Sequence, residues 1–142
     1  MKHIRVLSCA LVAALASIAP SVAMADGIVV IVNKANDNVV DKALVSRIYR
    51  GEARSWPSGG GIAVYDLPED NLLREDFDGS FVGKSEKALL ALWSQNALTG
   101  KALPPKVAAS DEDVKKAVAA NRNAIGYIQA RSLDDSVKAA LR

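Results

Sequence analysis

The segment Gly79–Ser85, GSFVGKS, resembles a nucleotide-binding loop but has the wrong spacing. That loop reads Gly-x-x-x-x-Gly-Lys-Ser/Thr after a strand, so that successive backbone N–H groups surround the phosphates. Here only three residues separate Gly79 from Gly83, and correcting the spacing places Asp78, which would repel a phosphate, at the first glycine position. We therefore expect Gly79 and Gly83 to end one helix and Ser85 to cap the next, with no nucleotide site.

Acidic residues are concentrated just before this segment, at Asp66, Glu69, Asp70, Glu75, Asp76 and Asp78. Paired carboxylates can transfer protons or bind calcium, but their spacing here fits no calcium-binding loop of the EF-hand type. Leu73, Phe77 and Phe81 recur every four residues, which predicts a helix over residues 70–82 that divides these acids between its faces. We interpret the stretch as a solvated helix start, in which Arg74 is four residues from both Asp70 and Asp78.

The first 25 residues have the pattern of a secretory signal. A positive start precedes an apolar run over residues 6–19, and Ala23-Met24-Ala25 provides a small-residue cleavage site. The run is shorter than the 18 or so apolar residues that a membrane span needs, so we expect no membrane anchor. The sequence thus predicts cleavage after Ala25 and one mature domain over residues 26–142.

The only histidine and the only cysteine, His3 and Cys9, both fall within that predicted signal. Their loss excludes thiol nucleophiles, histidine bases and zinc sites built on these residues. Without Lys2 and Arg5, 16 of the 18 basic residues remain against 16 acidic residues. A neutral chain gives no indication of a nucleic-acid partner. We expect no enzyme, no cofactor and no metal site.

Strand-like and helix-like segments alternate along the mature chain, which favours an α/β domain with a largely parallel sheet. Strands are expected over residues 27–33, 62–65, 106–109 and 124–128, and helices from Asp41, Ser85, Ser110 and, at the end of the chain, about Asp134. In parallel sheets, ligands bind beyond the carboxyl ends of strands. This rule points to Asn33 and to the segment that begins at Asp66.

Several short motifs occur in a consistent order along the chain. They are Ile28–Asn33, Leu44–Gly51, Trp56 before glycines, Arg74–Phe77, Gly83–Ser85, Trp93, Pro105 with Val107, Ser110-Asp111 and Ala124–Tyr127. Together they resemble the phosphate-type substrate-binding proteins of ABC transporters, and more closely their short single-domain relatives. The resemblance implies a single lobe of a type II periplasmic-binding-protein-like fold, with a mostly parallel sheet flanked by helices.

The chain departs from that family in the loop that binds phosphate. The family carries an arginine and then Ser-Gly-Thr at the positions that read Leu67 and Asn71-Leu72-Leu73 here. The usual charge-assisted hydrogen bonds to phosphate are therefore missing. A single lobe also cannot close over a solute, because hinge closure needs two bodies.

These observations predict a periplasmic, non-catalytic solute-binding-like domain with an altered phosphate loop. The residues expected to meet a small anion are Asp66, Asn71 and Arg74, with Asn33 as a weaker candidate. The alternative is a periplasmic interaction or sensor-partner protein that keeps the fold without binding an anion, and a hydrolase or lyase is the least favoured interpretation. An ABC permease, another periplasmic protein or a second copy of the chain would be the partner.

Overall fold

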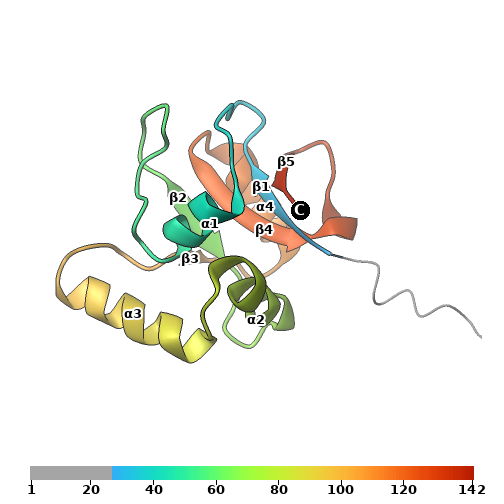
Figure 1. Ribbon diagram of the computed structural model, residues 1–142. Helices are drawn as coiled ribbons and strands as arrows, with labels where there is room; N and C mark the ends of the chain where they lie inside the picture. Colours follow the sequence, from blue (N-terminus) through green and yellow to red (C-terminus); the bar gives the residue numbers. More distant parts are fainter. Residues whose placement is uncertain (1–26) are drawn as a thin grey trace, which may run out of the picture.

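The computed structural model describes residues 27–142 as a mixed α/β fold around one five-stranded sheet (Figure 1). The strand order is β3-β2-β4-β1-β5. The elements in chain order are β1 (Ile28–Val32), α1 (Lys42–Tyr49), β2 (Ala63–Asp66), α2 (Leu72–Phe77), the π-helical turn η2 (Asp78–Val82), α3 (Glu86–Leu98), β3 (Lys106–Val107), α4 (Asp111–Ala120), β4 (Ala124–Gln129), the 3-10 turn η3 (Ala130–Ser132) and β5 (Lys138–Leu141). The predicted signal peptide lies outside the described residues and stays a prediction.

The sheet is parallel except for β1. Strand β2 pairs in parallel with β3 and with β4, whereas β1 pairs antiparallel with both β4 and β5. The prediction of a mostly parallel sheet flanked by helices is thus confirmed. Because β1 runs opposite to β2, its carboxyl end lies at the other edge of the sheet, a point that decides the geometry of the site.

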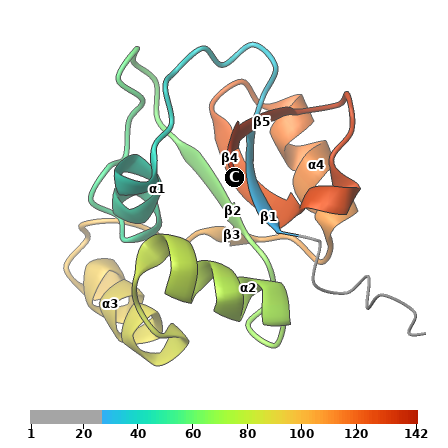
Figure 2. The same ribbon diagram turned by 45° about the vertical axis from the view of Figure 1, so that its right-hand side comes forward.

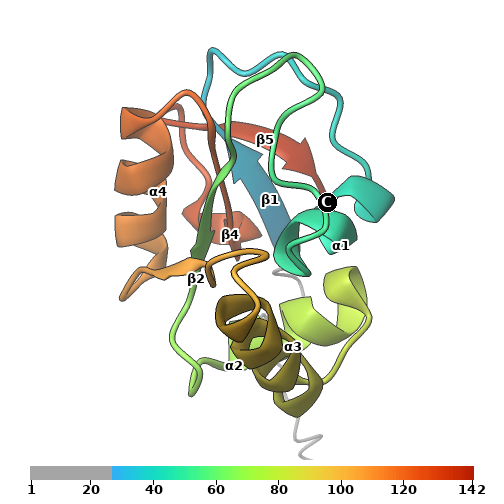
Figure 3. The same ribbon diagram turned by 90° about the vertical axis from the view of Figure 1, so that its left-hand side faces the viewer.

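Helices cover both faces of this sheet. Figure 3 shows α4 on one side and α1 on the other, while Figures 2 and 3 place α2 and α3 together at one end. The buried apolar side chains come from β1 and β4, which form the centre of the core, and from α1, η2 and α4. Helix α4 lies so close to β4 that a Cβ added to Gly126 would come within 2.5 Å of Val114 Cγ1.

Three predicted helix starts are confirmed by their caps. The side chains of Asp41, Ser85 and Ser110 accept hydrogen bonds from the backbone N–H groups of Leu44, Ala88 and Asp113. The helix expected over residues 70–82 is present as α2 followed directly by η2. It ends at Gly83 with a φ of 74°, whereas Gly79 lies inside η2 rather than at a helix end.

The prediction of a closing helix from about Asp134 is wrong. Asp134 instead accepts a hydrogen bond from the N–H of Ser136 at 2.9 Å, which makes a turn. The chain then forms β5, which pairs with the free side of β1. A short helix without packing partners is only marginally stable in water, whereas pairing with the buried strand β1 satisfies the backbone groups of this segment.

Among residues 27–142, no helix has both the length and the apolar character needed to cross a membrane.

Candidate functional site

The four residues expected at the site lie at two opposite edges of the sheet. Asp66, Asn71 and Arg74 are together beyond the carboxyl end of β2. Asn33 follows β1, whose direction is reversed, and its Nδ2 donates to the carbonyl oxygens of Val118 at 2.9 Å and Ala119 at 3.0 Å. Asn33 therefore binds the last turn of α4, away from the other three.

Asn71 has a structural role at the start of α2. Its Oδ1 accepts a hydrogen bond from the N–H of Leu73 at 2.9 Å, so it is the N-cap of the helix. The cap fixes the first turn of α2 and thereby the direction in which Arg74 leaves the helix. Whether Asn71 also contacts a ligand stays a prediction.

Arg74 is buried and surrounded by acceptors of this chain. Its Nη1 donates to the carbonyl oxygen of Leu67 at 2.8 Å. Its Nε lies 3.5 Å from Asp66 Oδ2 and 3.9 Å from Asp78 Oδ2, and the arginine side chain is only 10% exposed. Of the two partners considered from the sequence, Asp78 is confirmed as an ion-pair partner of Arg74 four residues away.

Asp66 is held from its other side by β4. Its Oδ1 accepts hydrogen bonds from the N–H of Leu67 at 2.9 Å and from the hydroxyl of Tyr127. Burial, and after it the charge of Asp66, raises the pKa of Tyr127 well above its ordinary value, so the hydroxyl keeps its proton and donates a hydrogen bond to the Asp66 carboxyl group.

Aromatic rings separate this polar group from water. Phe77 stacks on Tyr127 with ring centroids 3.8 Å apart, and Tyr49 meets both rings edge-on. The hydroxyl of Tyr49 is itself occupied, because it donates to the carbonyl oxygen of Tyr65 at 2.8 Å. We refer to Asp66, Arg74, Asp78 and Tyr127 as the acid–arginine cluster.

Two carboxyl groups share one guanidinium in this cluster. Burial raises the pKa of Asp66, and the Tyr127 hydrogen bond and the Arg74 charge offset only part of that rise. Burial, and after it the negative charge of Asp66, raises the pKa of Asp78 to about 7. Within the described part of the chain, Arg74 Nε and Asp78 Oδ2 are buried without a hydrogen-bond partner. The cluster is therefore short of positive charge.

This arrangement is poorly suited to binding an external anion. An oxyanion site needs donors whose positive charge is not already neutralised. Arg74 supplies the only cation among the cluster's four residues, and two carboxyl groups already face it. Across residues 27–142, no three histidine, cysteine or acidic side chains are grouped so as to hold a metal ion.

Sequence reasoning missed two members of the cluster as site residues, Asp78 and Tyr127. Asp78 was assigned to a solvated helix start, yet it is 2% exposed. The four-residue spacing from Arg74 was the signal that pointed to it. For Tyr127 the signal is a phenol in an otherwise apolar buried strand, since a buried hydroxyl usually finds a hydrogen-bond partner.

Comparison with protein-family models shows to which family the chain belongs. The PBP superfamily domain matches residues 12–141, nearly the whole chain. The chain belongs to the PBP superfamily. No curated protein matches the sequence.

Solved structures of two phosphate-transport proteins share this fold. An ABC-type phosphate transport receptor from Vibrio cholerae is 26% identical with a TM-score of 0.63, and the match covers 80% of this chain and 45% of the receptor. A putative phosphate ABC transporter substrate-binding protein from Clostridium perfringens, solved with bound phosphate, is 27% identical with a TM-score of 0.64, and the match covers 80% of this chain and 44% of that protein. This PBP superfamily chain thus spans less than half the length of these two relatives.

Proposed function

We propose that this chain is a non-catalytic, periplasmic solute-binding-like domain that keeps the fold of phosphate receptors without holding phosphate beyond β2. The observation that carries the proposal is the position of Arg74, which lies between Asp66 and Asp78 and is buried with them. The chain's own carboxyl groups take the place that an external anion would need beside this guanidinium.

The side chains around the cluster support the same conclusion. Leu67, where phosphate-binding relatives carry an arginine, is completely buried and offers only its backbone groups, both of which bind within the cluster. Leu72, in place of the close-approach glycine, is 80% exposed. Phosphate at this edge would meet two acids and an apolar surface, with few donors to replace its hydration.

A phosphate titration followed by NMR tests this proposal residue by residue. We expect the backbone N–H groups of residues 66–73, other than Pro68, and the Nε–H of Arg74 to keep their chemical shifts when millimolar phosphate is added at constant ionic strength. Because each N–H signal belongs to a known residue, phosphate binding at this end of the sheet can be distinguished from anion binding elsewhere in the protein. A saturable shift of these signals that Asn71→Ala weakens would overturn the proposal.

A protein-interaction role is the second candidate, favoured by exposed apolar side chains at the same edge. Leu72 follows β2 and Val107 ends β3, the adjacent parallel strand; they are 80% and 62% exposed. A contiguous exposed apolar patch is typical of a surface that another protein covers, and we infer that these two side chains contribute to one. We propose an ABC permease, another periplasmic protein or a second copy of this chain as the partner.

Site-specific photo-crosslinking in the periplasm tests this role. A photoreactive amino acid at position 72 is expected to give one discrete crosslinked product. The same residue at position 39 is the matched control, because Val39 is 86% exposed but follows β1 at the opposite edge. Failure to crosslink from position 72, or identical products from both positions, would count against a partner at this edge.

A further inference from the structure

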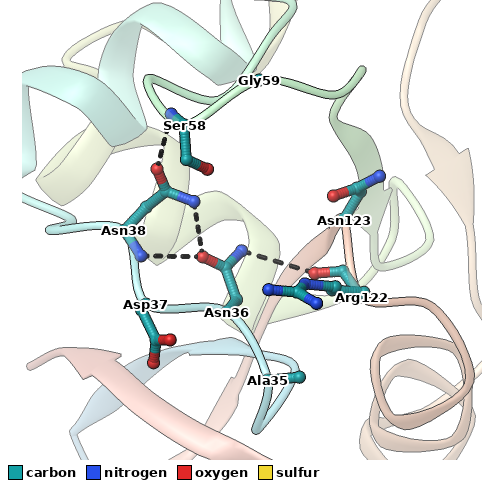
Figure 4. Close-up of a pocket in the computed structure, with 8 residues that line it drawn as sticks. All are labelled: Ala35, Asn36, Asp37, Asn38, Ser58, Gly59, Arg122 and Asn123. Carbon is teal, nitrogen blue, oxygen red and sulfur yellow. Dashed lines mark hydrogen bonds between the residues drawn. The ribbon is translucent and has the colours of Figure 1, made fainter.

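A polar cavity lies at the edge of the sheet opposite the acid–arginine cluster, where β1 ends and β4 begins. Its volume is about 360 Å³, and residues 35–38, Ser58, Gly59, Arg122 and Asn123 line it (Figure 4). We refer to it as the Arg122 pocket. None of its lining residues belongs to the cluster, so ligand binding in this pocket does not depend on whether the other edge of the sheet binds phosphate.

One wall of the pocket is fixed by a buried asparagine. Asn36 is 3% exposed, and its Oδ1 accepts hydrogen bonds from the N–H of Asn38 at 3.0 Å and from Asn38 Nδ2 at 2.8 Å. Asn38 in turn accepts, through its Oδ1, the N–H of Ser58 at 3.1 Å. The loop after β1 is thereby connected to the loop before β2, and the wall is formed before any ligand arrives.

The opposite wall is equally well fixed. The indole N–H of Trp56 donates to the carbonyl oxygen of Asn123 at 3.0 Å. Gly60 has a φ of 92°, and a Cβ there would come within 3.0 Å of the Asn123 side chain. Only glycine allows this loop to pack so closely against Asn123, which holds the asparagine at the pocket.

The donors that remain free are on Arg122 and Asn123. Within residues 27–142, the guanidinium of Arg122 has no hydrogen bond or ion pair, and the side-chain amide of Asn123 has no hydrogen bond. Asp37 contributes a carboxylate, but it lies 3.6 Å from Lys138 Nζ, which balances its charge. In Figure 4 the Arg122 side chain extends toward Asn36. The pocket thus carries one uncompensated positive charge beside fixed amides.

We propose that the Arg122 pocket binds a small polar carboxylate. The planar guanidinium donates two parallel N–H···O bonds to a carboxylate, a geometry that a point charge does not provide. The Asn123 amide and the Ser58 hydroxyl line the same pocket and offer hydrogen-bonding groups for a polar substituent of the ligand. A hydroxy acid fits this set of groups better than a plain fatty acid does.

NMR titrations with acetate, lactate and sulfate test the assignment. Lactate is expected to shift the Nε–H signal of Arg122 and the side-chain amide signals of Asn36 and Asn123 in a saturable manner, with acetate binding more weakly. The Nε–H of Arg47, on the exposed side of α1, is the internal control for non-specific anion contact and is expected to stay unchanged. Arg122→Gln is expected to weaken lactate binding at least tenfold.

Each outcome decides one part of the proposal. We expect the fold to tolerate Arg122→Gln, since Arg122 is exposed and, among residues 27–142, only its backbone carbonyl accepts a hydrogen bond. Unchanged Arg122 and Asn123 signals at millimolar lactate would overturn the site. Sulfate binding as tightly as lactate would overturn the carboxylate assignment, because sulfate is a tetrahedral dianion that lacks the planar carboxylate group.

Discussion

Replacing Arg74 with methionine is expected to lower the free energy of unfolding by about 3–5 kcal/mol at pH 8, the usual cost of removing one partner from a buried ion pair. The variant keeps the apolar stem of the side chain and removes its charge. Asp66 and Asp78 then face each other in the core without a cation. Urea denaturation followed by tryptophan fluorescence measures the loss.

Arg47→Met is the matched control for this experiment. Arg47 is exposed on α1, so its replacement is expected to change stability by no more than about 0.5 kcal/mol. The cluster would be energetically unimportant if both variants lost the same stability. A second test is rescue: Asp78→Asn in the Arg74→Met background is expected to restore part of the loss, and a double-mutant cycle gives the coupling.

Local features of this fold were predictable because their causes lie within a few residues. The caps Asp41, Ser85 and Ser110 each bind an N–H three residues ahead, so sequence alone contains both partners. The apolar segments of β1 and β4 likewise indicated strands. Such signals do not depend on what the rest of the chain does.

The direction of the strands was not predictable in this way. The wrong direction expected for β1 led to the wrong placement of one site residue, Asn33. Nothing in the sequence of β1 indicates that it runs against β2, because direction is set by pairing with β4, almost 100 residues later. Asn33 was therefore grouped with Asp66, although the two lie at opposite edges. The same non-local pairing overrides the helix expected at the end of the chain, where β5 completes the sheet beside β1.

The acid–arginine cluster was only partly predictable for a related reason. The sequence indicated Asp66 and Arg74 as site residues, and Arg74–Asp78 as a helical pair. It did not indicate that β4 brings the Tyr127 hydroxyl to Asp66, 61 residues away in the sequence, or that Tyr127 and Phe77 stack. These distant contacts bury the two acids, and burial in turn raises their pKa values.

The protein is expected to become less stable as the pH rises from 5 to 8, by about 2–3 kcal/mol, given that one unit of pKa difference is worth about 1.4 kcal/mol. The pKa of Asp78 is raised to about 7 in the folded chain, mainly by burial. Unfolded aspartate loses its proton near pH 4, so between these values the folded state binds more protons and stability falls with increasing pH. Asp66, whose pKa is also raised, acts in the same direction.

No imidazole obscures this signal, because residues 27–142 contain no histidine. Asp78→Asn replaces the acid with a neutral group of the same shape and is expected to remove most of the decline between pH 5 and 8. Asp76→Asn, an exposed neighbour, is expected to retain the wild-type slope. Urea denaturation of the three proteins at several pH values measures the slopes.

An unchanged slope in Asp78→Asn would show that Asp78 does not hold the proton. A decline that disappears in Asp78→Asn but persists in Asp76→Asn would mean that the domain carries one proton in its core beyond the carboxyl end of β2. That proton would lower the charge of two acids that share a single arginine, and it would make the folded core more stable below pH 7 than above it. The carboxyl groups beyond β2 would then gain and lose protons as part of the folded core, and this end of the sheet would not offer a free site for an anion.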